Sequence, residues 1–175
     1  MQFTNLPVAL EELPAIEEVT FSPLEPAHLT VQKIVYWIWV CVALIVSAAL
    51  FYFVESFQSI YILLPVLTGI LVVAVLVWFA ITADFSNSGY ALREKDVLYR
   101  SGWLRRSIQV VPLSRVQHVS VQSGPIERRY DLASVSLYTA GAEQADLTIR
   151  GINSATALQV KNWITAQLHG SDTTQ

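Results

Sequence analysis

The sequence has few residues suited to redox or metal chemistry, with one cysteine and three histidines among 175 residues. Cys41 lies within a long apolar run, which excludes a disulfide framework and a cysteine-based metal site. His28, His118 and His169 are scattered, and no pair has the spacing of metal ligands. Glycine-rich phosphate loops are also absent. We therefore expect no metal and no other cofactor.

Charge is scarce as well, at 14% of the chain against 53% hydrophobic residues, with a mean hydropathy of +0.45. This is too apolar for an ordinary soluble domain, so part of the chain should lie in lipid. Residues 1–33 carry five glutamates and one lysine, whereas residues 82–175 carry ten Lys or Arg and eight Asp or Glu. An excess of two positive charges is far from a nucleic-acid-binding footprint, so nucleic acid is not an expected partner.

Two uncharged runs are long enough to cross a bilayer. Residues 34–54 and residues 60–81 contain no charged side chain over 21 and 22 positions. At about 1.5 Å of rise per residue, each run matches the roughly 30 Å of hydrocarbon in a membrane. Only residues 55–59 separate the runs, so we expect two antiparallel transmembrane helices joined by a tight non-cytoplasmic turn. The absence of ionisable side chains within both runs favours an anchor over a transport pore.

Basic residues near the runs set the expected orientation. Lys33 precedes the first run, and Arg93, Lys95 and Arg100 follow the second within about 20 residues, whereas the turn carries no Lys or Arg. The positive-inside rule therefore places both termini in the cytoplasm. A cleavable signal peptide is not expected, because the first apolar run begins after 33 mostly acidic and polar residues.

Residues 1–33 form an acidic leader that holds four of the seven prolines. Such a composition cannot build a core by itself, so we expect a mostly extended segment. The segment VTFSPLEP, residues 19–26, has an alternative interpretation, in which it docks on the cytoplasmic domain or along the membrane surface.

After Asp84 the pattern changes to short alternating apolar segments separated by turns, which is typical of half-buried antiparallel strands. Residues 82–169 should therefore form a cytoplasmic β domain, followed by a flexible tail at 170–175. The segments REKD and SGWLR predict hairpin turns. The predicted strands cover residues 88–93, 96–101, 105–111, 117–122, 133–139 and 145–150.

Alternation within these strands predicts which side chains are buried. The predicted buried set comprises Ile108, Val110, Val119, Val121, Val135, Leu137, Leu147 and Ile149. The predicted outward set comprises Ser107, Gln109, Ser120, Ser134, Ser136, Thr148 and Arg150. Residues 154–168 predict a closing helix with Ser154 or Asn153 as its N-cap.

Three segments resemble a known family. They are NSGYALREKDVLYRSGWLRR, PLSRVQHVSVQSGPIERRYDLASVSLYTAG and IRGI. They follow two membrane spans, as in bacterial pleckstrin-homology-like (PH-like) membrane proteins of the YdbS type, which they resemble. The resemblance implies a membrane α-helical hairpin followed by two curved antiparallel sheets and a C-terminal capping helix. It brings no established enzymatic activity. The family usually has glycine where Asp131 stands, and aspartate tolerates the left-handed backbone better than most residues.

Catalysis is a poor explanation for the polar residues of this domain. His118, Ser114, Ser120 and Asp131 lie in or near one strand without a nucleophile-elbow motif. His118 also alternates with two valines, which predicts a place on the outer face. We therefore expect a surface histidine, no catalytic residue and no enzyme.

Two groups of arginines are candidate contacts with a lipid or a partner. Arg105 and Arg106 follow Trp103 in a hairpin turn. This basic-aromatic tip either rests on an anionic leaflet, where each basic residue contributes about 1 kcal/mol, or is a solvated charge pair. The second group either forms ion pairs with Glu127 or Asp131 and binds loop carbonyls, or contacts a phosphate, a lipid headgroup or a partner protein. This group consists of Arg115, Arg128 and Arg129.

Together these features predict a non-enzymatic, multi-pass protein of the bacterial cytoplasmic (inner) membrane that presents a PH-like interaction domain at the inner face. The expected partners are the lipid bilayer and another membrane protein, and the resemblance makes a second PH-like membrane protein a candidate. The alternative is a sensor of anionic lipid headgroups that uses the Trp103, Arg105 and Arg106 tip. PH-like folds bind lipids, peptides and proteins, so the fold alone does not choose between them.

Overall fold

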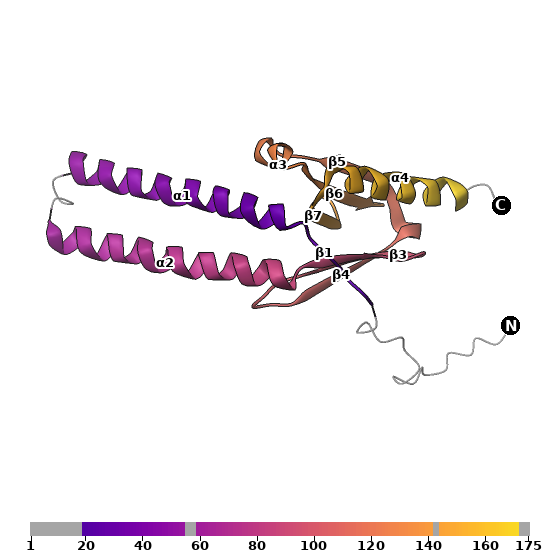
Figure 1. The fold of residues 1–175 in the computed structure, drawn as a ribbon, viewed down its shortest axis with the longest axis horizontal. Helices are drawn as coiled ribbons and strands as arrows, with labels where there is room; N and C mark the ends of the chain where they lie inside the picture. The colour runs from indigo at the N-terminus through magenta and orange to yellow at the C-terminus, as the bar shows by residue number, and fades with distance from the viewer. Residues whose placement is uncertain (1–18, 55–58, 142–143, 172–175) are drawn as a thin grey trace, which may run out of the picture.

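The computed structural model describes residues 19–54, 59–141 and 144–171. A helical hairpin and a β domain lie end to end, and both long helices lead into the domain (Figure 1). The elements in chain order are β1 (Ser22–Pro23), α1 (Pro26–Phe53), α2 (Ile60–Asn87), β2 (Gly89–Leu92), β3 (Asp96–Ser101), β4 (Ser107–Pro112), the 3-10 helix η4 (Leu113–Arg115), β5 (Val116–Gln122), α3 (Pro125–Arg129), β6 (Leu132–Thr139), β7 (Leu147–Asn153) and α4 (Ser154–Ser171).

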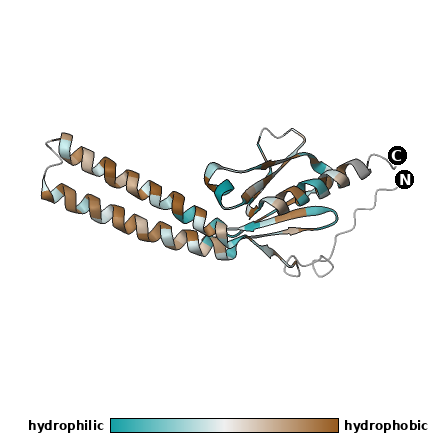
Figure 2. Ribbon diagram, turned by 45° about the horizontal axis from the view of Figure 1, so that its top comes forward, coloured by the Kyte–Doolittle hydropathy of each residue, from teal (hydrophilic) through white to brown (hydrophobic). Residues whose placement is uncertain are grey.

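The two long helices correspond to the predicted membrane spans. Both are apolar enough to cross a bilayer, and Figure 2 shows hydrophobic residues along most of their length. Near the domain, the Tyr36 hydroxyl donates a hydrogen bond to the Ala74 carbonyl at 2.8 Å. The Trp37 and Trp78 ring centroids lie 6.1 Å apart, and the Lys33 ammonium lies 4.6 Å from the Trp78 centroid. Aromatic rings and a basic residue at one level are typical of a membrane–water interface.

Both helices continue past the apolar runs into the domain. α1 begins at Pro26, whereas the sequence predicted an extended leader up to residue 33. Proline is favoured in the first turn of a helix because the N–H that it lacks would have no partner there. α2 ends at Asn87, beyond the predicted limit of residue 81. The predicted turn lies outside the described residues except for Ser59, the N-cap of α2.

Two antiparallel sheets and a helix build the domain. The strand orders are β1-β2-β3-β4 and β5-β6-β7, and α4 packs against the second sheet. This confirms the predicted combination of a helical hairpin with two antiparallel sheets and a C-terminal helix. The buried core includes Val97 and Val111 from the first sheet, Val135, Leu137, Leu147 and Ile149 from the second, and Ala157, Val160 and Ile164 from α4.

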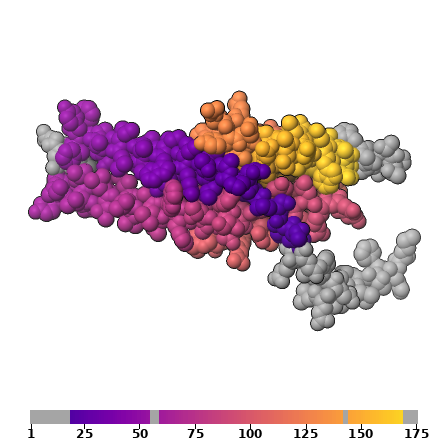
Figure 3. Space-filling model, viewed as in Figure 1, coloured from indigo at the N-terminus to yellow at the C-terminus, as the bar shows by residue number. Residues whose placement is uncertain are grey.

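The segment before α1 docks on the domain, which confirms the alternative interpretation of residues 19–26. β1 pairs antiparallel with β2, and Leu24 is buried in the core. The Glu25 N–H donates a hydrogen bond to the Gly151 carbonyl at 2.9 Å. In Figure 3 the indigo segment that leads into α1 lies across the domain surface.

Alternation gave the wrong orientation for β4. Ile108 and Val110 are 42% and 46% exposed, whereas Val111 is buried and Gln109 lines a cavity between the sheets. The strand SIQVVP has apolar residues in both phases, so its pattern alone does not fix the buried face. Register decides the phase, because Val111 pairs with the fully buried Val97.

Ser136 is a second correction to the predicted faces. It was expected to face outward, but it lies on the central strand β6 and is only 7% exposed. Its hydroxyl lies 3.1 Å from the Thr148 hydroxyl, in a hydrogen bond that either group can donate. This bond satisfies the buried hydroxyl, so the strand tolerates serine at that place.

Candidate functional site

The tip of the β3–β4 hairpin lies against α2. Gly102 has a φ of +102°, and a Cβ there would clash with the Arg105 carbonyl, so the turn requires glycine. The Trp103 ring meets the Phe79 ring edge-on, with centroids 5.1 Å apart. The next residue, Leu104, is 90% exposed. Because Phe79 belongs to the second apolar run, this contact holds the tip beside the predicted membrane interface.

The two arginines of the tip complete a basic and apolar surface. Arg105 and Arg106 are both exposed, and neither forms an ion pair within the part of the chain that the structure describes. The tip therefore combines an aromatic ring held by α2, an exposed leucine and two available guanidinium groups.

The other candidate arginines lie at opposite ends of β5. Arg115 ends η4, before the strand, whereas Arg128 and Arg129 lie on α3, after it. All three are exposed, and the ion pairs expected for them do not occur among residues 19–54, 59–141 and 144–171. The Glu127 carboxylate instead accepts a hydrogen bond from the Gly124 N–H at 2.7 Å and caps α3. Among the described residues, these arginines therefore do not hold the ends of β5 in place through ion pairs.

Asp131 and His118, two further polar residues considered in the sequence, lie in positions that the fold explains. Asp131 has a φ of +53°, which confirms that aspartate takes the left-handed position where the family usually has glycine. His118 is exposed, as predicted, and stacks on Tyr138 with ring centroids 4.3 Å apart. Within the described segments, no three His, Cys, Asp or Glu side chains are grouped to hold a metal.

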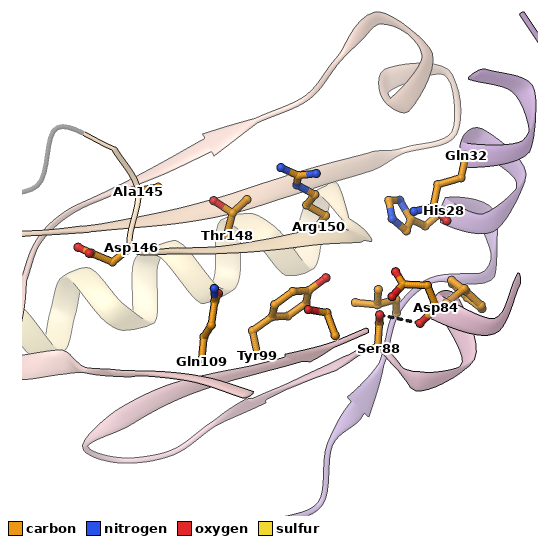
Figure 4. Close-up of a pocket in the computed structure, with 13 residues that line it drawn as sticks. His28, Gln32, Asp84, Ser88, Tyr99, Gln109, Ala145, Asp146, Thr148 and Arg150 are labelled. Carbon is orange, nitrogen blue, oxygen red and sulfur yellow. Dashed lines mark hydrogen bonds between the residues drawn. The ribbon is translucent and has the colours of Figure 1, made fainter. Parts of the chain in front are cut away.

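The structure adds a site that the sequence did not predict, a cavity of about 360 Å³ at the seam between the two sheets. Figure 4 shows Thr148 and Arg150 lining it from β7, opposite Tyr99 and Gln109 from β3 and β4. The two long helices contribute the residues at the end of the cavity nearest the hairpin. These residues are His28, Gln32, Asp84 and Phe85.

Polar groups dominate this cavity. Burial, and then the nearby Asp84 carboxylate, raise the pKa of the Tyr99 hydroxyl above its ordinary value, so Tyr99 is a neutral donor at physiological pH. The His28 Nδ1 and Gln32 Oε1 atoms are buried without a hydrogen-bond partner in the structure. No local sequence pattern pointed to this site, because its walls come from segments that are far apart in the chain.

Comparisons with known proteins agree with this architecture. A family model described as "Bacterial PH domain" matches residues 34–168, which include most of α1, all of α2 and most of the β domain. The transmembrane protein YdbS of Bacillus subtilis (strain 168) is 37% identical over 51 residues, which are 29% of this chain and 32% of that relative. The match therefore spans about a third of the curated relative. No solved structure matches significantly. With two apolar helices that lead into two antiparallel sheets and a capping helix, this membrane protein belongs to the bacterial PH domain family.

Proposed function

We propose that the protein presents its PH-like domain at the inner face of the bacterial cytoplasmic membrane as a non-enzymatic docking module for another membrane protein. The observation that supports this most is the free edge of β4. β4 ends the strand order of the first sheet, so its outer edge has no partner strand among the described residues. Ile108 and Val110 on this strand expose their apolar side chains.

A free edge with apolar side chains favours a protein partner. Unpaired N–H and C=O groups on an edge strand pair readily with a strand from another chain, and uncovered apolar edges promote aggregation. A partner that covers β4 would satisfy the backbone groups and bury both side chains. A second PH-like membrane protein is our preferred partner, because its own sheet edges would lie at a similar height above the membrane.

Short connections restrict the orientation of the domain. Only Ser88 separates the end of α2 from the start of β2. The Arg100 Nε–H donates a hydrogen bond to the Asn87 carbonyl at 3.1 Å. At the other helix, the bond from Glu25 to Gly151 ties the start of α1 to β7. A domain held by both helices would present β4 to a neighbour at a defined angle.

Photocrosslinking in membranes tests the docking proposal. A photoreactive residue replaces Val110 in the full-length protein, and the matched control replaces Gln122, which is exposed on β5. We expect a crosslink to another membrane protein at position 110 and none at position 122. Ile108→Glu should weaken this crosslink, whereas Gln122→Glu should not. Recovery of monomer alone at position 110 would count against the proposal.

The contact between Trp103 and Phe79 supports a second candidate function, the sensing of anionic lipid headgroups by the hairpin tip. The Trp103–Phe79 contact would hold Leu104 and the two arginines near the leaflet surface. Each arginine would then contribute about 1 kcal/mol of attraction to an anionic leaflet.

An environment-sensitive label tests the tip in full-length protein reconstituted into anionic bilayers. The label is attached to Leu104→Cys or, as a control, to Lys95→Cys at the opposite end of β3, both in a Cys41→Ser background. We expect a blue-shifted emission at position 104 only, with the shift reduced by Arg105→Glu and Arg106→Glu. Equal, water-like emission at both positions would exclude lipid contact by the tip.

A further inference from the structure

Three adjoining hollows run from the β domain into the helical hairpin. The inter-sheet cavity measures about 360 Å³, a groove at the base of the helices about 590 Å³, and a groove between α1 and α2 about 440 Å³. The cavity and the first groove share His28, Gln32 and Arg150. The two grooves share Tyr36, Trp39 and Val77. Because neighbouring hollows share lining residues, they lie next to one another in a row, called the path below.

The path changes from polar to apolar along its length. The inter-sheet cavity carries the carboxylate of Asp84, the guanidinium of Arg150 and the hydroxyl of Tyr99. The groove between the helices is apolar apart from Tyr36 and Trp39, which line its end nearest the domain. Its other lining residues are aliphatic side chains, Pro65 and Gly69. A ligand that fills the whole path must therefore be amphiphilic.

The polar end lies at the depth of lipid headgroups. Asp84 follows the second apolar run by three residues, a rise of about 4.5 Å along the helix. Gln32 precedes the first run by two residues, a rise of about 3 Å. The headgroup layer on each side of the hydrocarbon core is roughly 5–7 Å thick. The bilayer itself would thus supply a headgroup at the mouth of the cavity.

The polar end is closely packed and has unused hydrogen-bonding capacity. A Cβ on Gly151 would clash with the His28 ring, so this histidine lies directly on the β7 backbone. The buried His28 Nδ1 and Gln32 Oε1 atoms have no hydrogen-bond partner within the described structure. Unpaired buried polar atoms are costly, and a polar ligand would satisfy them. The cavity volume falls within the roughly 300–1,000 Å³ range of small-molecule sites.

The charges around the cavity fit a zwitterionic headgroup better than a purely anionic one. Arg150 supplies a planar guanidinium, the group best suited to a phosphate. Asp84 supplies a carboxylate on the opposite side, and Asp146 adds a second that already accepts hydrogen bonds from Thr139. A ligand with a phosphate and an ammonium group would match both signs of charge.

We propose that this path binds one membrane glycerophospholipid with an amine-bearing, zwitterionic headgroup. The phosphate contacts Arg150, the ammonium faces Asp84, and one acyl chain lies in the groove between α1 and α2. The exposed Ile108 and Val110 side chains and the residues of the hairpin tip do not line this path, so the inference does not depend on the proposed function.

Lipid retention tests the proposal. Full-length protein is equilibrated in mild detergent with equimolar phosphatidylethanolamine and phosphatidylglycerol, and bound lipid is measured by native mass spectrometry. We expect one phosphatidylethanolamine per chain, in preference to phosphatidylglycerol. Arg150→Gln should lower its retention about tenfold or more, because the substitution removes a charge-assisted hydrogen bond.

The apolar end is tested separately. Among the described residues, a Cβ on Gly69 would meet no atom within 4 Å, so the side chain of Gly69→Leu can extend into the groove without displacing neighbouring side chains. We expect this variant to lose the lipid as well. Two controls should keep wild-type retention. Val72→Leu adds volume on an exposed face of α2 outside the grooves, and Lys161→Gln removes a cation from α4 outside the cavity.

Three results would overturn the proposal. These are unchanged retention in both Arg150→Gln and Gly69→Leu, a preference for phosphatidylglycerol, and full displacement of the lipid by free phosphoethanolamine, which lacks acyl chains. Thermal melting in detergent checks that each variant is folded. If Arg150→Gln fails to fold, Tyr99→Phe, which removes one donor and keeps the ring, replaces it. Photocrosslinking at Val110 should be unchanged in the lipid-free variants, which separates this test from that of the docking function.

Discussion

At the scale of single residues, a glycine allows a close contact between the helical hairpin and the β domain. Gly151 has a φ of +69° and lies against the His28 ring. Together with the Glu25 hydrogen bond to the same residue, this contact fixes the start of α1 on β7. A larger residue at position 151 would push α1 away from the second sheet.

Gly151→Ala should therefore reduce the free energy of unfolding by about 2–4 kcal/mol, because it adds overlap with His28 to the strain of a left-handed backbone. Gly141→Ala is the matched control, since Gly141 also has a positive φ, +83°, but a Cβ there would meet no atom of the described residues within 4 Å. The control should lose only about 1–2 kcal/mol. Thermal unfolding in detergent measures both, and equal losses would show that the His28 contact is unimportant.

The raised pKa of Tyr99 gives a pH dependence. Burial and the Asp84 carboxylate disfavour the tyrosinate in the folded state, so the folded pKa lies above the unfolded one. The contribution of Tyr99 to stability is full below the unfolded pKa and is lost as the pH rises through the folded pKa. Absorbance at the tyrosinate band measures the titration, and Tyr99→Phe should remove a group that titrates at a higher pH than an ordinary tyrosine. The free energy of unfolding of this variant should also fall less at alkaline pH than that of the wild type. Unchanged titration would contradict the assignment.

At the scale of elements, tertiary contacts reassign segments that composition had classified otherwise. Residues 26–33 are acidic-leader residues by composition, yet they form the first turns of α1. Leu24 is one of several scattered apolar residues in that leader, yet it is buried in the core beside β1. α3 also forms a short helix between β5 and β6, in a stretch for which neither a strand nor a helix was predicted.

Leu24→Ala should destabilise the protein by about 2–3 kcal/mol, because it removes a buried side chain and leaves space in the core. Ser22→Ala, at an exposed position of the adjacent strand β1, should change stability by no more than about 0.5 kcal/mol. Denaturant unfolding of both variants in detergent compares them. A neutral Leu24→Ala would mean that the segment docks only weakly.

At the scale of the whole molecule, both long helices lead directly into the domain, so the orientation of the helices in the membrane decides on which side the domain lies. The positive-inside bias predicts that the domain and both termini lie in the cytoplasm and that the turn between the helices lies outside. A membrane-impermeant thiol reagent should label Ser59→Cys but not Ser171→Cys in intact cells. Labelling of Ser171→Cys alone would show the opposite orientation, with the domain on the other side of the membrane.

Much of the fold was predictable from local patterns, whereas the inter-sheet cavity was not. The two hairpin turns and most strand limits follow from alternation and turn residues, and the left-handed backbone at Asp131 follows from the family resemblance. The cavity joins His28 to Arg150 across more than a hundred positions of the chain. Residues so far apart carry no shared signal in one sequence, because their proximity arises only when the sheets assemble.

The sequence by itself determined the two spans and the mainly antiparallel β domain. Uncharged runs of 21 and 22 residues are stable only where water is excluded, and alternating apolar residues form strands with one buried face. Tertiary structure decided the phase of β4, the burial of Leu24 and Ser136, and the path from the cavity into the hairpin. These features depend on what packs opposite each residue, and only the assembled sheets and helices supply those neighbours.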